Sequence, residues 1–266
     1  MRKAIFFDID GTLLDRVHGI DKITPRVESA LRNLQRAGHY IFIATGRPAA
    51  FIYPEILNFG FDGFVMSNGA LVLVDGKIIF RSELDRKGVK KICEYAASER
   101  IEYMLESYPD VYFPRSFTTC EEFCRKIGVD YSKFIRSFDI EKISVSKIEC
   151  VTARKDPENL DVIYKKMLAT PGFTGWADPF HFKSMEIYSD KVSKATGILH
   201  VLDYLGIDVK NSCAFGDGYN DREMIKTVGT GFAMATGSDE LKNSAAHVVP
   251  GVHEDGVAFG IEKFLL

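Results

Sequence analysis

Short apolar runs alternate with amphipathic stretches through the first eighty residues of the chain. Ile5 to Phe7 is wholly apolar, and Tyr40 to Ala44 is a second run of the same kind. Between them, Thr24-Pro25 supplies a helix cap and a first-turn proline, and apolar residues follow at helical spacing from Val27 to Ala37. Thr45 to Pro48 then turns into another helix. Buried strands alternating with helices predict an α/β fold with a doubly wound parallel (Rossmann-like) sheet.

A third strand and a hairpin complete this first segment. Phe64 to Met66 is apolar and ends at Ser67-Asn68-Gly69. Leu71 to Val74 and Lys77 to Phe80 are then separated by the two residues Asp75-Gly76. An Asp-Gly pair between two such runs is a strong hairpin signal.

The pattern of residue types changes between about Glu83 and Tyr188, where aromatic and charged residues are interspersed. We expect an inserted α+β domain here. Its predicted helices are Arg86 to Ser98, Thr118 to Ile127 and Pro157 to Leu168, and its predicted strands include Lys147 to Ala153 and Met185 to Tyr188. We therefore predict a catalytic core formed by residues 1–82 and 188–266, and a cap, or lid, formed by residues 83–187.

The alternation of helices and strands returns after the insert. It predicts a helix over Ser193 to Tyr204, a strand over Ser212 to Phe215, and a second helix opened by Gly216 to Asp221. Two short strands near Gly231 to Met234 and His247 to Val249 follow, and a final helix begins at about Asp255. The first and last segments together complete one core domain that the insert splits.

The composition of the 266 residues is that of a soluble globular protein, with 46% hydrophobic and 27% charged residues. A net charge of -3 gives no reason to expect nucleic acid or an anionic membrane as a partner. No stretch reaches the roughly 18 apolar residues that a spanning helix needs. Asp8 interrupts the first apolar run too early for a signal peptide. The sequence predicts a cytoplasmic protein, a monomer or a weak homodimer.

The cysteines and histidines give no sign of a metal site. Five cysteines, an odd number without C-x-x-C spacing, favour a reducing compartment. Cys120 and Cys124 stand one helical turn apart but have no paired histidine or cysteine nearby. The histidines at 18, 39, 200, 247 and 253 lack chelating spacing, so we predict no zinc site.

The strongest chemical signal lies directly after the first strand. Asp8 and Asp10 occupy alternate positions, and regular strand geometry would place them on opposite faces. The chain must therefore leave the sheet at Ile9 or Asp10, where Gly11 allows a bend. Two close carboxylates repel each other unless a cation holds both ionised. We expect a Mg²⁺ site with a nucleophilic aspartate at the carboxyl edge of the sheet.

Other polar residues stand where predicted core strands end or helices begin. In chain order the segments read D-x-D-G-T at Asp8, T-G-R at Thr45, a lysine at Lys194, and G-D-x-x-N-D at Asp217. This order resembles the haloacid dehalogenase superfamily. The N-G-A after the third strand and the long insert resemble its Cof-like phosphatases.

The resemblance implies that Asp8 attacks phosphorus and becomes an aspartyl-phosphate. Asp10 would protonate the leaving alcohol and then activate water, and its backbone carbonyl would bind the metal. Asp217 would join Asp8 on Mg²⁺. Asp221 would orient a metal-bound water or Lys194, although the helix dipole alone also favours an acidic residue there.

The remaining residues would bind phosphate and substrate. By the same resemblance, Lys194 would neutralise the nucleophile and the phosphate, Thr45 would hold a phosphate oxygen, and Asn220 would add an amide donor. Less specific contacts are expected from Thr12, Gly46, Arg47 and Asn68. Four of these residues have a structural alternative. Lys194 could be a solvated lysine and Thr45 an ordinary strand-end threonine. Asn220 could cap its helix, and Arg47 could pair with a local carboxylate.

We expect a Mg²⁺-dependent phosphatase of small phosphorylated metabolites. Sugar phosphates lead by family analogy, with nucleotides and pyridoxal phosphate as alternatives. A phosphomutase or a non-catalytic phosphometabolite-binding protein would need the same pocket. The lid would choose the substrate, and an aromatic and basic patch in it could contact the substrate or form lid core: Trp176, Phe180, His181, Phe182 and Lys183.

Overall fold

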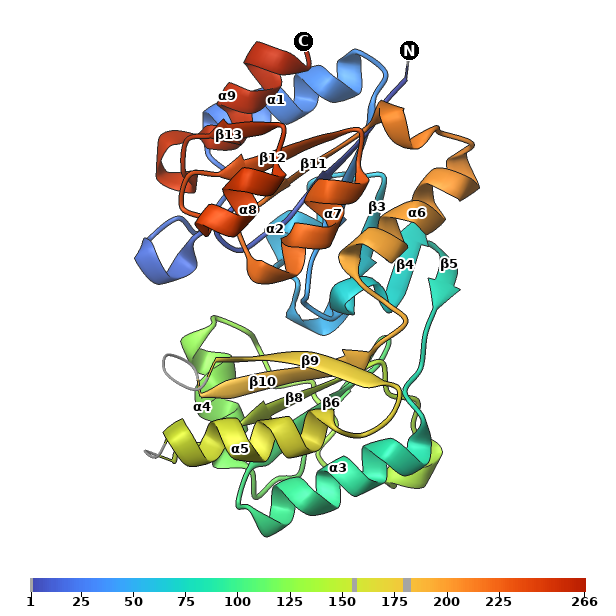
Figure 1. Cartoon of the computed structure of the whole chain (residues 1–266), viewed down its shortest axis with the longest axis vertical. Helices are drawn as coiled ribbons and strands as arrows, with labels where there is room; N and C mark the ends of the chain where they lie inside the picture. The colour runs from blue at the N-terminus through green and yellow to red at the C-terminus, as the bar shows by residue number, and fades with distance from the viewer. Residues whose placement is uncertain (1, 155–156, 179–182) are drawn as a thin grey trace. The chain divides into compact units, whose positions relative to one another are not determined.

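The computed structural model describes residues 2–154, 157–178 and 183–266, and the chain forms two compact units (Figure 1). The core unit runs up to Gly46 and includes Tyr53–Phe80 and Ser193–Leu266. The insert unit consists of Arg47–Ile52 and Arg81–Val192. Each unit has its own sheet and its own apolar core.

In the described residues, the core unit contains an eight-stranded sheet with the order β13-β12-β11-β1-β2-β3-β4-β5. The strands are β1 Ala4–Phe7, β2 Tyr40–Ala44, β3 Gly63–Met66, β4 Leu71–Val74, β5 Lys77–Arg81, β11 Ser212–Gly216, β12 Thr230–Met234 and β13 His247–Val249. Neighbouring strands from β13 to β3 pair in parallel, and β4 is antiparallel to β3. The predicted α/β class with a doubly wound sheet is confirmed.

Helices cover both faces of this sheet (Figure 1). The helices α6 Lys194–Leu205, α7 Arg222–Thr227 and α8 Asp239–Ser244 pack over one face, where their apolar side chains join those of the strands. The helices α1 Pro25–Arg36 and α9 Gly256–Phe264 pack together on the other face. Burial of strand residues on both sides explains why their sequences read as continuous apolar runs.

Local signals place the connections as expected. The Thr24 hydroxyl accepts from the Val27 backbone N–H and caps α1, which begins at Pro25. In the β4–β5 turn, Asp75 and Gly76 have φ of 47° and 72°, the positive values that a tight hairpin turn requires. After Pro48 the predicted helix is shorter than expected: a single 3₁₀ turn and the four-residue helix α2 Pro54–Leu57.

In the insert unit, the described residues form an antiparallel five-stranded sheet with the order β7-β6-β8-β10-β9. Its strands are β6 Glu102–Glu106, β7 Val111–Tyr112, β8 Lys147–Val151, β9 Phe173–Asp178 and β10 Ser184–Ser189, and its helices are α3 Arg86–Ser98, α4 Thr118–Lys126 and α5 Pro157–Leu168. The helices, β8 and β10 lie where the sequence predicts them. The strands β6, β7 and β9 were not predicted.

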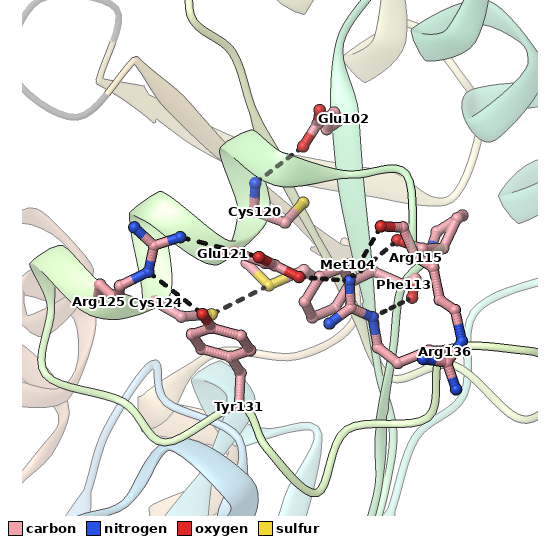
Figure 2. Close-up of polar contacts among 11 residues, drawn as sticks. Glu102, Met104, Phe113, Arg115, Cys120, Glu121, Cys124, Arg125, Tyr131 and Arg136 are labelled. Atoms are coloured by element: carbon pink, nitrogen blue, oxygen red, sulfur yellow. Dashed lines mark hydrogen bonds and ion pairs between the residues drawn. The ribbon is translucent and has the colours of Figure 1, made fainter.

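Helix α4 is held by hydrogen bonds and a sulfur–sulfur contact with neighbouring residues (Figure 2). The Cys120 backbone N–H donates to the Glu102 carboxylate at 2.8 Å, and the Cys124 sulfur lies 3.7 Å from that of Met104. The Arg136 guanidinium donates to the Glu121 carboxylate at 2.8 Å. Both cysteines are buried free thiols that pack into the apolar core of the unit.

One face of the insert sheet carries a buried cluster of charges. Lys147 Nζ lies 3.3 Å from a Glu106 oxygen, 3.6 Å from Glu149 and 2.9 Å from Glu186. Burial raises the pKa of Glu106 to about 7 and of Glu149 to about 8, although Lys147 opposes both shifts. Burial alone would lower the pKa of Lys147, but the glutamates outweigh it and raise that pKa. We call these four residues the insert cluster.

Among the described residues, no helix combines the length and the apolar character needed to cross a membrane.

Candidate active site

The strand β1 delivers Asp8 to the carboxyl edge of the core sheet. The strand ends at Phe7, earlier than the expected departure at Ile9 or Asp10, although the Asp8 backbone N–H still donates to the Phe215 carbonyl at 3.0 Å. Asp8 is buried and Asp10 is exposed. The strand therefore ends early enough that its alternation does not decide where the two carboxylates point.

Gly11 permits the close packing behind this turn. Its φ is +79°, and a Cβ built on it would lie 2.0 Å from an Asp217 carboxylate oxygen. The Thr12 hydroxyl donates to Asp217 Oδ1 at 2.9 Å. The turn after Asp8 thus positions Asp217, which lies more than two hundred residues later, and any residue larger than glycine would push it away.

Lys194 joins two carboxylates at the start of α6. Ser193 caps this helix through a capping box with Thr196, which orients the first turn. Lys194 Nζ lies 2.8 Å from Asp8 Oδ1 and 2.6 Å from Asp221 Oδ1. Burial alone would lower the pKa of Lys194, but these two carboxylates outweigh it and raise that pKa. Lys194 is therefore a buried, charged ammonium.

The loop after β11 wraps its own backbone around Asp221. The second carboxylate oxygen of Asp221 accepts from the backbone N–H groups of Asp217 and Gly218, at 2.9 and 2.8 Å. Gly216 allows this, because a Cβ there would lie 2.5 Å from the Asp221 carboxyl carbon. Both oxygens of Asp221 are thus occupied by donors within the protein. The backbone donor at Gly218 was not predicted, since no side-chain type marks it.

Three carboxylates converge at this edge. Asp8, Asp217 and Asp221 each offer an oxygen within 4.8 Å of the others. Burial raises the pKa of Asp8 well above its usual value, with Lys194 opposing, and raises the pKa of Asp217 to about 7. Within this group, three carboxylates face the single ammonium of Lys194, which leaves two negative charges to balance.

That charge and donor set fit a hard divalent cation. Mg²⁺ prefers oxygen ligands, and it binds proteins through one or two carboxylates while keeping several waters. Asp8 and Asp217 are suited to bind it directly, because the oxygens of Asp221 are already held by Lys194 and two backbone N–H groups.

The phosphate-binding candidates of the core unit also meet. The Thr45 backbone N–H donates to the Val65 carbonyl, which holds the residue after β2 beside the end of β3. The Asn68 backbone N–H donates to the Thr45 carbonyl, and the Asn220 side-chain amide donates to Asn68 Oδ1 at 2.9 Å. Asn68 has a φ of +54°, a conformation that asparagine tolerates better than most residues. Gly46 follows Thr45 directly.

Two predicted contact regions belong to the insert unit. Arg47 belongs to the insert unit, where its Nη1 donates to the Phe51 carbonyl at 3.0 Å. In the aromatic and basic patch, Trp176 lies on β9 with an exposed side chain. Phe180, His181 and Phe182 lie outside the described residues, and Lys183 has a φ of +53°.

The comparisons with known proteins agree with this architecture. The haloacid dehalogenase-like hydrolase family matches residues 5–261. YkrA of Bacillus subtilis is 29% identical over 98% of this chain and 97% of its own length. The 5-amino-6-(5-phospho-D-ribitylamino)uracil phosphatase YitU of the same species is 27% identical over 98% of this chain and 96% of its own length.

A solved structure of similar fold is the subclass IIB sugar phosphatase BT4131, with a TM-score of 0.84, 24% identity and 98% coverage of both chains. The chain therefore belongs to the haloacid dehalogenase-like hydrolases. Within that family it is an enzyme of the phosphatase type.

Proposed function

We propose that this protein is a Mg²⁺-dependent phosphatase of small phosphorylated metabolites, with sugar phosphates as the leading class. The observation that carries the proposal is the convergence of Asp8, Asp217 and Asp221 at the carboxyl edge of the sheet, with Lys194 paired to Asp8 and Asp221. An anionic nucleophile must approach an anionic phosphoryl group, and this site places the ammonium of Lys194 beside the Asp8 carboxylate.

In the first step, a carboxylate oxygen of Asp8 forms a bond to phosphorus while the bond from phosphorus to the substrate oxygen breaks. Lys194 holds Asp8 Oδ1 at 2.8 Å, which fixes the carboxylate for in-line attack by its other oxygen. Asp10 gives its proton to the leaving oxygen, so the substrate departs as a neutral alcohol. General acid help of this kind contributes about 10²–10⁴ in rate.

In the second step, Asp10 accepts a proton from water as that water attacks phosphorus. The bond between Asp8 and phosphorus breaks, which releases inorganic phosphate and restores the Asp8 carboxylate. Exposure of Asp10 gives it access to both substrate and water. Asp8, Asp217 and the Asp10 carbonyl would hold Mg²⁺, which would supply charge neutralisation for the approaching anions.

The remaining core residues hold the phosphoryl group and the lysine. Thr45 would hold a phosphate oxygen through its hydroxyl, with Gly46 next to it in the chain, and the hydrogen bond between Asn220 and Asn68 fixes two amides beside them. Asp221 is a positioning residue for Lys194, since the two atoms lie 2.6 Å apart. Because these groups recognise only phosphate, we assign the choice of substrate to the insert unit as a cap, with Arg47 as a contributing residue.

Screening tests the substrate class. The purified protein is assayed with Mg²⁺ against sugar phosphates, nucleotides and pyridoxal phosphate, with free phosphate as the readout. We expect the highest kcat/KM among the sugar phosphates. A preference for nucleotides or pyridoxal phosphate would overturn the substrate class, while retaining the phosphatase.

Product analysis separates hydrolysis from the two rivals. A phosphatase releases phosphate and the free sugar in equal amounts, whereas a phosphomutase yields an isomeric sugar phosphate. A binding protein yields neither. The Asp217→Asn variant, which removes a charged metal ligand, should lose most activity, while Asp208→Asn at an exposed 3₁₀ cap should keep it.

A further inference from the structure

Outside the active site, two histidines and an aspartate converge in the core unit. Asp15, His18 and His253 each offer one ligand atom, and these atoms lie within 4.8 Å of one another. His18 Nδ1 lies 2.9 Å from Asp15 Oδ2, and His253 Nε2 lies 3.1 Å from the same oxygen. Sequence spacing gave no sign of this group, because Asp15 and His253 are 238 positions apart.

The distances suit a tetrahedral ion. Zn²⁺ binds imidazole nitrogen and carboxylate oxygen at about 2.0–2.2 Å, which places neighbouring ligand atoms roughly 3.4 Å apart. The two N···O distances in the structure, 2.9 and 3.1 Å, are only a few tenths of an ångström shorter. Small side-chain rotations would therefore open the group around an ion without moving the backbone.

The backbone that carries the three ligands is already fixed. Asp15 and Ile20 exchange two backbone hydrogen bonds, at 3.0 and 2.8 Å, and the Asp15 side chain caps the 3₁₀ turn that carries His18. On the other segment, Asp255 accepts from the Thr24 hydroxyl at 2.5 Å, just beyond the turn that carries His253. Little conformational freedom is left to lose when a ligand binds.

The chemistry of the three groups also favours a borderline metal over a hard one. Asp15 offers a carboxylate oxygen, and His18 and His253 each offer an imidazole nitrogen. Imidazole nitrogen suits Zn²⁺, Cu²⁺ and Ni²⁺, whereas Mg²⁺ prefers oxygen alone.

We propose that Asp15, His18 and His253 form a second metal site, distinct from the carboxylate site and selective for Zn²⁺ or a similar transition metal. The three protein ligands leave one tetrahedral position for water. Both histidines are partly exposed, which gives the ion an entry path. The ion would join the 15–20 segment, which follows directly from the Asp8–Thr12 turn, to the segment before α9.

The site can be tested by Zn²⁺ binding in competition with a chromophoric chelator. Excess Mg²⁺ is present throughout to occupy the carboxylate site. We expect the wild-type protein to bind Zn²⁺, and His18→Gln and His253→Gln each to bind it at least about tenfold more weakly, since each removes one of three ligands. His200→Gln is the matched control, because that imidazole stacks on Phe80 outside the group.

Co²⁺ provides a second readout that does not depend on activity. Bound in a tetrahedral site, it should give visible absorption bands in the wild-type protein and in Asp217→Asn, and these bands should be absent from His18→Gln. Thermal unfolding of each variant in chelator checks that it is folded. The proposal is overturned if the wild-type protein binds no Zn²⁺, or if His18→Gln and His253→Gln bind it as tightly as the control.

Discussion

The core unit and the insert unit each bring three carboxylates together with one lysine, yet the two clusters are built differently. In the core unit, Lys194 contacts Asp8 and Asp221, and the third carboxylate is Asp217. In the insert cluster, Lys147 lies within 4.0 Å of all three glutamates. Lys147 therefore lies at the centre of the insert cluster, whereas Lys194 lies to one side of the core carboxylates.

The difference follows from where the sequence places the carboxylates. The insert cluster occupies positions within strands β6, β8 and β10, where long side chains reach a shared lysine across the sheet. The core carboxylates are short side chains on turns after strands, held by backbone N–H groups and by Thr12. Only the core group brings its carboxylate oxygens within 4.8 Å of one another among the described residues. The insert cluster gathers its carboxylates on the lysine and leaves both buried Glu106 oxygens without a hydrogen bond, whereas the core carboxylates approach one another, as a shared cation would require.

The largest expected effect is on catalysis at Asp8. Asp8→Asn removes the nucleophile while keeping the size of the side chain, so kcat/KM for an aryl phosphate should fall by at least about 10³-fold. Steady-state kinetics measure the loss, and circular dichroism checks the fold. Retained activity in Asp8→Asn would remove Asp8 as the nucleophile.

Metal removal should also affect only the core cluster. Chelation of Mg²⁺ should stop turnover, and its return should restore it. Ca²⁺ should support little activity, because its longer and more variable coordination misaligns the attack. Equal rates with and without chelator would contradict the assignment of the carboxylate site.

Replacing the two lysines compares the clusters directly. Lys194→Met and Lys147→Met each leave buried carboxylates without their ammonium, and each should cost about 3–5 kcal/mol in the free energy of unfolding. Because we propose that the core carboxylates bind Mg²⁺, added Mg²⁺ should restore part of the loss in Lys194→Met and none in Lys147→Met. Chemical denaturation with and without Mg²⁺ measures both. An equal response of the two variants to Mg²⁺ would remove the distinction between the clusters.

The smallest expected effect is a pH dependence of stability from the insert cluster. The pKa of Glu106 is about 7 in the folded protein and near 4.5 when unfolded. A raised pKa means that the folded state holds its proton longer, so stability falls as pH rises from about 4.5 to about 7, by up to about 3 kcal/mol.

Glu106→Gln removes this titration. The stability of the variant relative to the wild-type protein should therefore increase between pH 5 and pH 8. Thermal unfolding at both pH values measures it, with the exposed Glu122→Gln as control. A difference that stays constant with pH would show that Glu106 does not titrate in this range.

The sequence predicted elements well where pattern and local signals agree. The strand β2 and the helices α3 and α5 were predicted to the residue, because caps and breaks bound their apolar positions. The strands β6, β7 and β9 were missed. Glu102 and Glu106 give the sequence of β6 polar ends, so it did not suggest a strand. The positions of these two residues are explained only by the neighbouring strands and the insert cluster.

The candidate sites were likewise predicted only in part. Motif order identified Asp8, Lys194, Asp217 and Asp221 as candidates, and the fold brings all four together. The approach of His18 to His253 could not be predicted, because it depends on the placement of two loops. Asp8 and Asp10 differ in burial for a related reason: β1 ends at Phe7, which only the pairing with its neighbours determines.

The most direct test of the proposed mechanism is to look for the phosphoryl group on Asp8. With an aryl phosphate whose leaving group departs without a general acid, Asp10→Asn should slow mainly the attack of water. The intermediate should therefore accumulate when enzyme, Mg²⁺ and this substrate are mixed and quenched in acid within one turnover. We expect mass spectrometry to find one phosphoryl group on the peptide that contains Asp8. Release of phosphate at full rate, with that peptide unmodified at every time point, would mean that water attacks the substrate directly and that Asp8 is not the nucleophile.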